Sequence, residues 1–232
     1  MVTAEPSPRV GETLPAAVDW IVAAIVAITG LALTVGGSAL TFVVDRGLLA
    51  ESAEAGQLTV IVFERDLTRA QMLDFTLEVV FWTGTGLLLT GIGLVLFGIG
   101  YAVTRHRSRR RESDGEPPGT YRANAVLGAV STVALSFLPF SPVIGGGIAG
   151  YLERDRSTSV GALAGFLASV PALVILAFVA VGMFAGLSAI QATGLGIVTA
   201  ATMVFAALVI AAYGAGLGAL GGFAGRRLAD RQ

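Results

Sequence analysis

The sequence FLPFSPVIGGGIAGYL, residues 137–152, decides how the second half of the chain folds. It ends the apolar segment 123–152, which as one straight helix would be about 45 Å long, well beyond a hydrocarbon core of roughly 30 Å. Pro139 and Pro142 lack an amide donor and push the preceding residue out of the helical region, and three glycines follow them. We therefore expect the segment to break near its middle.

The break has two alternative outcomes. A kinked span would deliver residues 153–156 to the outer side of a membrane, whereas a re-entrant hairpin would return them to the inner side. Charge favours the hairpin, because cytoplasmic flanks of membrane spans carry an excess of basic residues. Only the hairpin places all the later arginines inside: Arg122, Arg154, Arg156, Arg226, Arg227 and Arg231. The hairpin candidates are Pro139, Phe140, Ser141, Pro142, Gly145, Gly146 and Gly147.

The composition excludes a soluble enzyme, a disordered chain and a nucleic-acid-binding domain. Of the 232 residues 54% are apolar and 13% charged, against about 25% charged in a soluble domain. Apart from 123–152, the apolar residues form four long blocks: 18–44, 75–104, 160–190 and 193–225. We predict an all-α integral membrane protein with four transmembrane helices and the Pro/Gly-broken, re-entrant helical hairpin.

The first block, 18–44, has a rival interpretation as a cleaved signal peptide. Gly37-Ser38-Ala39 would be a tolerable cleavage site for such a peptide. The apolar run is about twice the length of a normal signal sequence and the leading segment is not basic, so we favour a retained helix. Asp19 lies near the start of this helix, where we expect it to reach water.

The second helix is expected to start in a polar stretch, residues 45–74. Leu58 to Phe63 is rich in β-branched residues and predicts a short strand. Thr68-Arg69-Ala70-Gln71 then fits a capping box, in which Thr68 accepts from a first-turn amide and Gln71 reaches back. We expect the helix to start there and to continue to about Thr104.

Charge also predicts the orientation and the domains. Residues 105–122 hold six arginines and three acids, whereas residues 45–74 hold three arginines and six acids. The N-terminus and 105–122 are therefore predicted to be cytoplasmic and 45–74 extracellular, in the plasma membrane. This divides the chain into an N-terminal two-helix hairpin (1–104), a basic linker (105–122) and a C-terminal membrane domain (123–232). The topogenic candidates are Arg105, Arg107, Arg109, Arg110 and Arg111.

Glycines recur along the apolar blocks at helical spacing. Two series seven residues apart occupy the second block: Gly84, Gly91, Gly98 and Gly86, Gly93, Gly100. A series four residues apart occupies the last block, and the same spacing recurs at 146/150 and 161/165. Small residues let membrane helices approach closely, so we expect the last helix to cover the hairpin. The helix-packing candidates are Gly84, Gly91, Gly98, Gly214, Gly218 and Gly222.

The residues that usually carry chemistry are scarce. There is no cysteine and no lysine, and His106 is the only histidine, so thiolate chemistry, a transition-metal ligand set and a phosphate loop of the usual kind lack their residues. Glu78 is the deepest acid, and both it and Asp74 are expected near the outer interface. We expect no catalytic, cofactor-binding or metal-binding residue and no enzyme activity.

The stretch from Asn124 to Pro171, NAVLGAVSTVALSFLPFSPVIGGGIAGYLERDRSTSVGALAGFLASVP, resembles a known family. This is a family of small multi-pass membrane proteins of halophilic archaea, known only as a domain of unknown function. The resemblance extends more loosely through AAYGAGLGALGGFAGRR to Arg227. It implies a plasma-membrane location, and it implies no activity or cofactor.

Two functions remain open from the sequence. The first is a non-enzymatic structural or partner-binding membrane protein, held together by glycine-mediated helix packing and bound to the lipid bilayer, to itself or to another membrane protein. The second is a small channel or transporter that uses the hairpin from Pro139 to Gly147 as a filter or gate. The apolar blocks offer no charge or polar cluster for a substrate, which favours the first.

Overall fold

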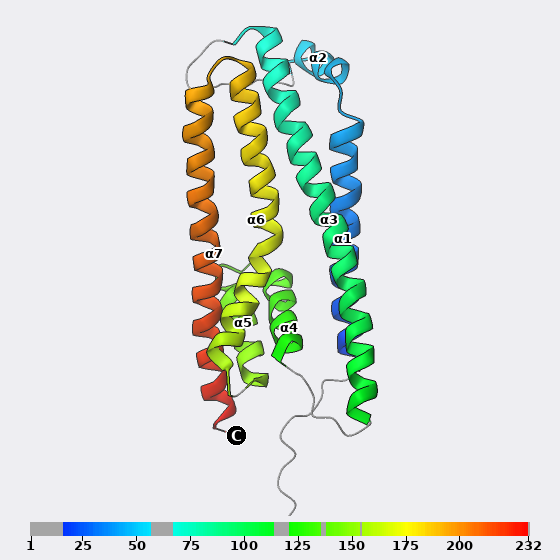
Figure 1. Cartoon of the computed structure of the whole chain (residues 1–232), viewed down its shortest axis with the longest axis vertical. Helices are drawn as coiled ribbons and strands as arrows, with labels where there is room; N and C mark the ends of the chain where they lie inside the picture. Colours follow the sequence, from blue (N-terminus) through cyan, green and yellow to red (C-terminus); the bar gives the residue numbers. More distant parts are fainter. Residues whose placement is uncertain (1–15, 57–66, 114–120, 136–137, 154, 232) are drawn as a thin grey trace, which may run out of the picture. The chain divides into compact units, whose positions relative to one another are not determined.

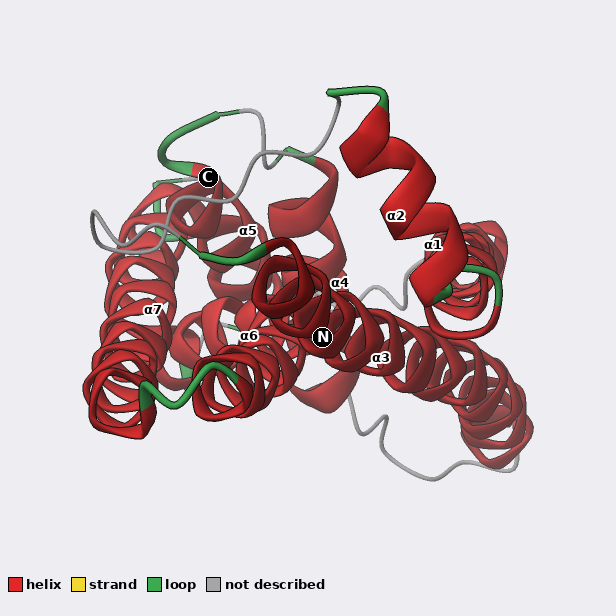
Figure 2. Ribbon diagram, turned by 90° about the horizontal axis from the view of Figure 1, so that it is seen from above, coloured by secondary structure: helices red, strands yellow, loops and turns green. Residues whose placement is uncertain are grey.

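The computed structural model describes residues 16–56, 67–113, 121–135, 138–153 and 155–231, and every element in these ranges is a helix (Figures 1 and 2). In chain order the helices are α1 (Ala16–Phe42), α2 (Arg46–Glu54), α3 (Arg69–Ser113), α4 (Tyr121–Ala134), α5 (Ser141–Leu152), α6 (Ser157–Ala189) and α7 (Thr193–Ala229). The predicted all-α class is confirmed for the described residues. The strand predicted at 58–63 lies outside them.

Four of the helices in the described part are long and apolar enough to cross a membrane: α1, α3, α6 and α7. Their spans have mean hydropathies between 2.1 and 2.5 and contain 26 to 39 residues. A helix rises 1.5 Å per residue, so each exceeds a core of roughly 30 Å. Large apolar side chains cover their outer faces, among them Ile28, Phe97 and Phe205. The chain is a multi-pass membrane protein.

The chain forms two compact units. Unit 1 contains Met1–Ala24, Ile99–Leu167 and Ala215–Gln232, and unit 2 contains Ile25–Gly98 and Ala168–Gly214. Each long helix therefore contributes one end to each unit, whereas α4 and α5 belong wholly to unit 1 and α2 to unit 2.

In unit 1 the predicted break of the segment 123–152 is confirmed. It forms two helices, α4 of 14 residues and α5 of 12 residues, which at about 1.5 Å per residue are both too short to cross a membrane. They pack against each other in antiparallel order, because Gly128 meets Ala149 and Thr132 meets Gly145. The fully buried core of this unit consists of small side chains, Ala125, Ala149, Val160 and Ala164.

In unit 2, α3 packs against both α1 and α6. Gly30 of α1 lies against the backbone of Gly91 and Val95 of α3. On the side of α6, Trp82 of α3 stacks on Phe178, with ring centroids 6.3 Å apart. A hydrophobic cluster of Phe75, Leu187, Ile190 and Ala192 closes this unit near the turn between α6 and α7.

The predicted start of α3 is confirmed. The Thr68 amide donates to Gln71 Oε1 at 3.1 Å, and the Gln71 amide donates to Thr68 Oγ1 at 3.3 Å. These two bonds form the reciprocal capping box. The predicted end near Thr104 is wrong, since α3 continues to Ser113. Arginine and glutamate are good helix formers, so the basic segment extends the helix to Ser113, and a glycine and two prolines follow in the sequence at 115–118.

The sequence analysis missed helix α2. Asp45 caps its start by accepting from the Leu48 amide at 2.8 Å, and Gly56 follows its end with a φ of 68°. An aspartate N-cap and a left-handed glycine eleven positions later are the usual boundaries of a short helix. The spacing of Asp45 and Gly56 is the signal that could have located it.

Candidate functional site

The three glycines of the hairpin, Gly145 to Gly147, lie where α5 meets two neighbouring helices. A methyl group at position 145 would overlap Gly128 and Thr132 of α4, and one at position 146 would overlap the backbone of Gly218 of α7. A methyl group at position 147 would lie 3.5 Å from the carbonyl oxygen of Gly221 of α7, which is an ordinary contact distance. Consecutive residues of a helix point in different directions, so a helix enclosed on several sides needs several consecutive small residues.

Helix α7 makes the complementary contacts. Gly222 meets Gly150 of α5 on one side and Ser157 of α6 on another. Gly218 meets Gly146 and Gly161 in the same way one turn earlier. Each of these contacts joins backbone to backbone with no space for a methyl group. The helices α5, α6 and α7 are therefore held at the closest approach that glycine allows.

In the described part of the turn between α4 and α5, three backbone amides donate to nearby carbonyls. The Leu138 amide donates to the Leu135 carbonyl at 2.8 Å, the Ser141 amide to Leu138 at 3.1 Å and the Val143 amide to Phe140 at 3.0 Å. Pro139 and Pro142 have no amide hydrogen to satisfy. Non-helical backbone in a membrane requires such satisfaction, because hydrocarbon supplies no hydrogen-bond partners.

Among the described residues of this turn, the exposed side chains are apolar. Phe140 is 64% exposed and Pro139 is also exposed, whereas Ser141 is buried at the start of α5. At the opposite end of the hairpin, the buried Asn124 donates from Nδ2 to Glu153 Oε2 at 3.2 Å. The first residues of α4 and the residue after α5 therefore lie together. The hairpin has a polar base and an apolar tip.

The other glycine candidates fall into three groups. Gly84 and Gly91 face α1, where added methyl groups would meet Thr41 at 2.6 Å and Thr34 at 2.5 Å. Gly98 and Gly214 are buried. In the second seven-residue series, Gly86 faces Phe178 of α6, whereas nothing lies within 4 Å of the positions that methyl groups at Gly93 and Gly100 would occupy.

A buried ion pair joins α1 to α3 in unit 1. Arg105 Nε lies 3.1 Å from Asp19 Oδ1, and the Tyr101 hydroxyl donates to the same oxygen at 3.0 Å. Asp19 is 5% exposed and Arg105 7% exposed. The expectation that Asp19 reaches water was therefore wrong. The signal was present in the sequence, because Asp19 lies at the start of one apolar block and Arg105 directly follows the end of the next one.

The remaining topogenic candidates do not share this burial. Arg107 and His106 are exposed on α3. Arg109, Arg110 and Arg111 belong to the same helix, and their side chains lie outside the described part. The five arginines therefore divide into one that pairs inside the protein and one that faces outward, with three that the structure does not describe at side-chain level.

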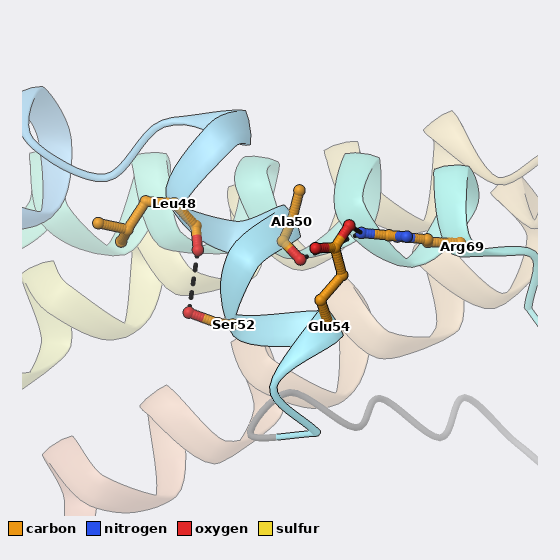
Figure 3. A network of polar contacts seen from close by, with 5 residues as sticks. All are labelled: Leu48, Ala50, Ser52, Glu54 and Arg69. Carbon is orange, nitrogen blue, oxygen red and sulfur yellow. Dashed lines mark hydrogen bonds and ion pairs between the residues drawn. The ribbon is translucent and has the colours of Figure 1, made fainter.

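Helix α2 and the start of α3, in unit 2, carry exposed ion pairs. Arg69 at the start of α3 lies 2.6 Å from Glu54 of α2 and also donates to the Ala50 carbonyl at 3.2 Å (Figure 3). Arg46 lies 2.9 Å from Asp74. These pairs attach α2 to α3. One turn further along α3, Glu78 accepts from Trp82 Nε1 at 3.1 Å and is partly buried.

The contacts described above are of two kinds, close helix packing at glycines and pairing of opposite charges. Within the described ranges no group of three or more histidine, aspartate or glutamate side chains is placed to hold a metal ion. The distinctive contacts are those of the hairpin with α7 and of Asp19 with Arg105. The candidate site is therefore the α4–α5 hairpin together with the glycine-lined face of α7 that contacts it.

Residues 122–228 match the model of a family described as "Family of unknown function (DUF5518)". That match covers the hairpin, α6 and nearly all of α7. It is consistent with the resemblance seen in the sequence, and the halophilic origin is not part of the match. No curated protein and no solved structure matches the chain.

Proposed function

We propose that the protein is a non-enzymatic membrane scaffold, in which a re-entrant hairpin is fixed in place by α7. The observation that carries this is the contact of Gly146 and Gly150 of α5 with the backbone of Gly218 and Gly222 of α7. These contacts leave no space for a methyl group. A substrate could pass between α5 and α7 only if the two helices separated, which a filter or gate would have to do repeatedly.

The re-entrant placement of the hairpin is part of this proposal. Its two helices are too short to cross a membrane, and its base carries the hydrogen bond from Asn124 to Glu153. The described residues of its tip are apolar where they are exposed, and the Leu138 and Ser141 amides donate to carbonyls of the turn. Both ends belong to unit 1, as do the ends of α3 and α7 that carry most of the arginines of the described residues. These properties suit a hairpin that enters the bilayer from one side and returns to it.

The charges of the two units support the orientation that we propose. Among the described residues, unit 1 contains ten arginines and five acids, whereas unit 2 contains two arginines and five acids. The excess of arginine marks the cytoplasmic side. We place residues 105–122 and both termini in the cytoplasm and residues 45–74 outside the cell, in the plasma membrane.

The partners that we propose are lipid and another transmembrane segment, a second copy included. Gly93 and Gly100 support this, because both are exposed on α3 and have open space beside them. They lie among large exposed apolar side chains such as Ile92, Leu96 and Phe97. Glycines on a membrane-facing surface allow another helix to approach closely.

Flux through reconstituted vesicles separates the scaffold from the channel or transporter. Vesicles that contain the full chain should hold potassium and proton gradients as long as vesicles without protein, because the hairpin is packed at backbone contact. A protein-dependent flux that changes with Phe140→Ala at the hairpin tip would favour the gate. Leu220→Ala, on an exposed position of α7, is the matched control for the loss of an apolar side chain.

A further inference from the structure

Four helix ends meet at one end of unit 1. The start of α4 meets the end of α5 through the hydrogen bond from Asn124 to Glu153. The start of α6 meets the last turns of α7, where Ser157 lies against Gly222. The end of α5 also reaches α7, because a methyl group at Gly225 would lie 2.9 Å from the Tyr151 amide nitrogen. The residues next to these contacts therefore lie together at this end of unit 1.

This end of unit 1 presents exposed arginines with few carboxylate partners. Arg122 of α4, Arg156 before α6, and Arg226 and Arg227 of α7 are exposed. Arg226 forms an ion pair with Asp230 at 3.7 Å. Within the described residues, no carboxylate oxygen lies within 4 Å of the guanidinium groups of the other three. Their charge is available to an anion from outside the protein.

Among these arginines, Arg227 is the one that contacts an aromatic ring. Its guanidinium carbon lies 4.5 Å from the centre of the Phe223 ring. Phe223 is 48% exposed and precedes Arg227 by one turn of a helix that is long enough to span the membrane. The ring therefore lies closer to the apolar layer and the guanidinium closer to its boundary. A cation–π contact of this kind holds the guanidinium over the ring face, and the N–H donors at the edge of the group can bind an acceptor.

We propose that this end of unit 1 binds the phosphate of an anionic phospholipid head group, with Arg227 as the main contact and Phe223 as its support. A guanidinium binds phosphate oxygens through two parallel hydrogen bonds. The acyl chains of the same lipid would lie along the exposed apolar face of α7, which includes Leu220. The occupant is a lipid because the anion site and the apolar face are continuous along one helix. The inference goes beyond the scaffold role and requires only that the chain is in a membrane.

Native mass spectrometry of the full chain in detergent tests the proposal, with dioleoyl phosphatidylglycerol and dioleoyl phosphatidylcholine as probes. We expect the anionic phosphatidylglycerol to bind more tightly than the phosphatidylcholine. Arg227→Gln should weaken the binding of phosphatidylglycerol about fivefold, since an arginine at an anionic surface contributes on the order of 1 kcal/mol. Phe223→Leu should weaken it less, and should add nothing in the double variant. Arg46→Gln, which removes an equal charge from unit 2, should leave the affinity for phosphatidylglycerol unchanged.

Three results would overturn the proposal. The first is an affinity for phosphatidylglycerol that Arg227→Gln leaves unchanged, in a variant whose thermal unfolding midpoint equals that of the wild type. The second is an equal loss in Arg46→Gln, which would show that net charge alone attracts the lipid. The third is displacement of the lipid by millimolar inorganic phosphate, which would make the site one for the free anion. The flux measurement does not depend on any of these results. A failure of the lipid site can therefore be told from a failure of the proposed scaffold function.

Discussion

Asp19 and Arg105 illustrate how one residue pair can decide a local structure in a membrane protein. Both side chains are almost completely buried and their atoms are 3.1 Å apart. Two opposite charges placed together cost far less in an apolar setting than either charge alone. The pair therefore specifies which part of α3 lies beside the start of α1, and the Tyr101 hydroxyl strengthens that choice.

Asp19→Asn should lower the stability of the full chain by about 3 kcal/mol, because it leaves Arg105 buried without a carboxylate. Asp74→Asn is the matched control. It removes the partner of Arg46 in an exposed pair and should cost less than about 1 kcal/mol. The measurement is the unfolding midpoint of each variant in one detergent. Equal losses in the two variants would contradict a special role for the buried pair.

At the scale of the element, the hairpin depends on the identity of its glycines. A Cβ atom at Gly146 would overlap the Gly218 backbone, so α5 and α7 would have to separate. At Gly216, on an exposed face of α7, nothing lies within 4 Å of that position. The same substitution thus has opposite consequences at two glycines in neighbouring helices.

Gly146→Ala should destabilise the protein by about 2 kcal/mol through overpacking. Gly216→Ala should be neutral or stabilising by up to about 1 kcal/mol, because alanine favours the helix more than glycine does. Thermal unfolding of both variants in the same detergent compares them directly. If Gly146→Ala proved as stable as Gly216→Ala, the hairpin would not be fixed by α7 and the gate would regain support.

At the scale of the whole molecule, the proposed topology assigns every connection to a side of the membrane. The chain has no native cysteine, so single cysteines can report sidedness. Thr158, at the start of α6, and Asp230, after α7, are exposed and are both placed inside. Ala55, after α2, is exposed and is placed outside.

Thr158→Cys and Asp230→Cys should react with a membrane-impermeant maleimide only after cell lysis, whereas Ala55→Cys should react in intact cells. The reason is that the hairpin returns the chain to the side on which it started, and α6 and α7 then cross once each. Labelling of Thr158→Cys in intact cells would mean that the segment before it crosses the membrane, and the re-entrant placement would be wrong.

Local physical signals in the sequence were sufficient for much of the fold. Long apolar blocks predicted the four helices that are long and apolar enough to cross a membrane. Thr68 and Gln71 predicted the start of α3, and Pro139 and Pro142 predicted the break between α4 and α5. Each signal acts within a few residues of the structure it determines. Where the local pattern was misread, as with the end of α3 and the short helix α2, the boundaries were wrong or the helix was missed.

Only the tertiary structure decided which helices meet. The sequence shows that Gly146, Gly161 and Gly218 are small, but their partners depend on the rotation and register of separate helices. The pairing of Asp19 with Arg105, 86 residues apart, depends on the same long-range register. The sequence by itself determined a membrane protein with a broken hairpin. Packing determined that α7 contacts this hairpin at its backbone, because such contact requires glycines from two helices at one place.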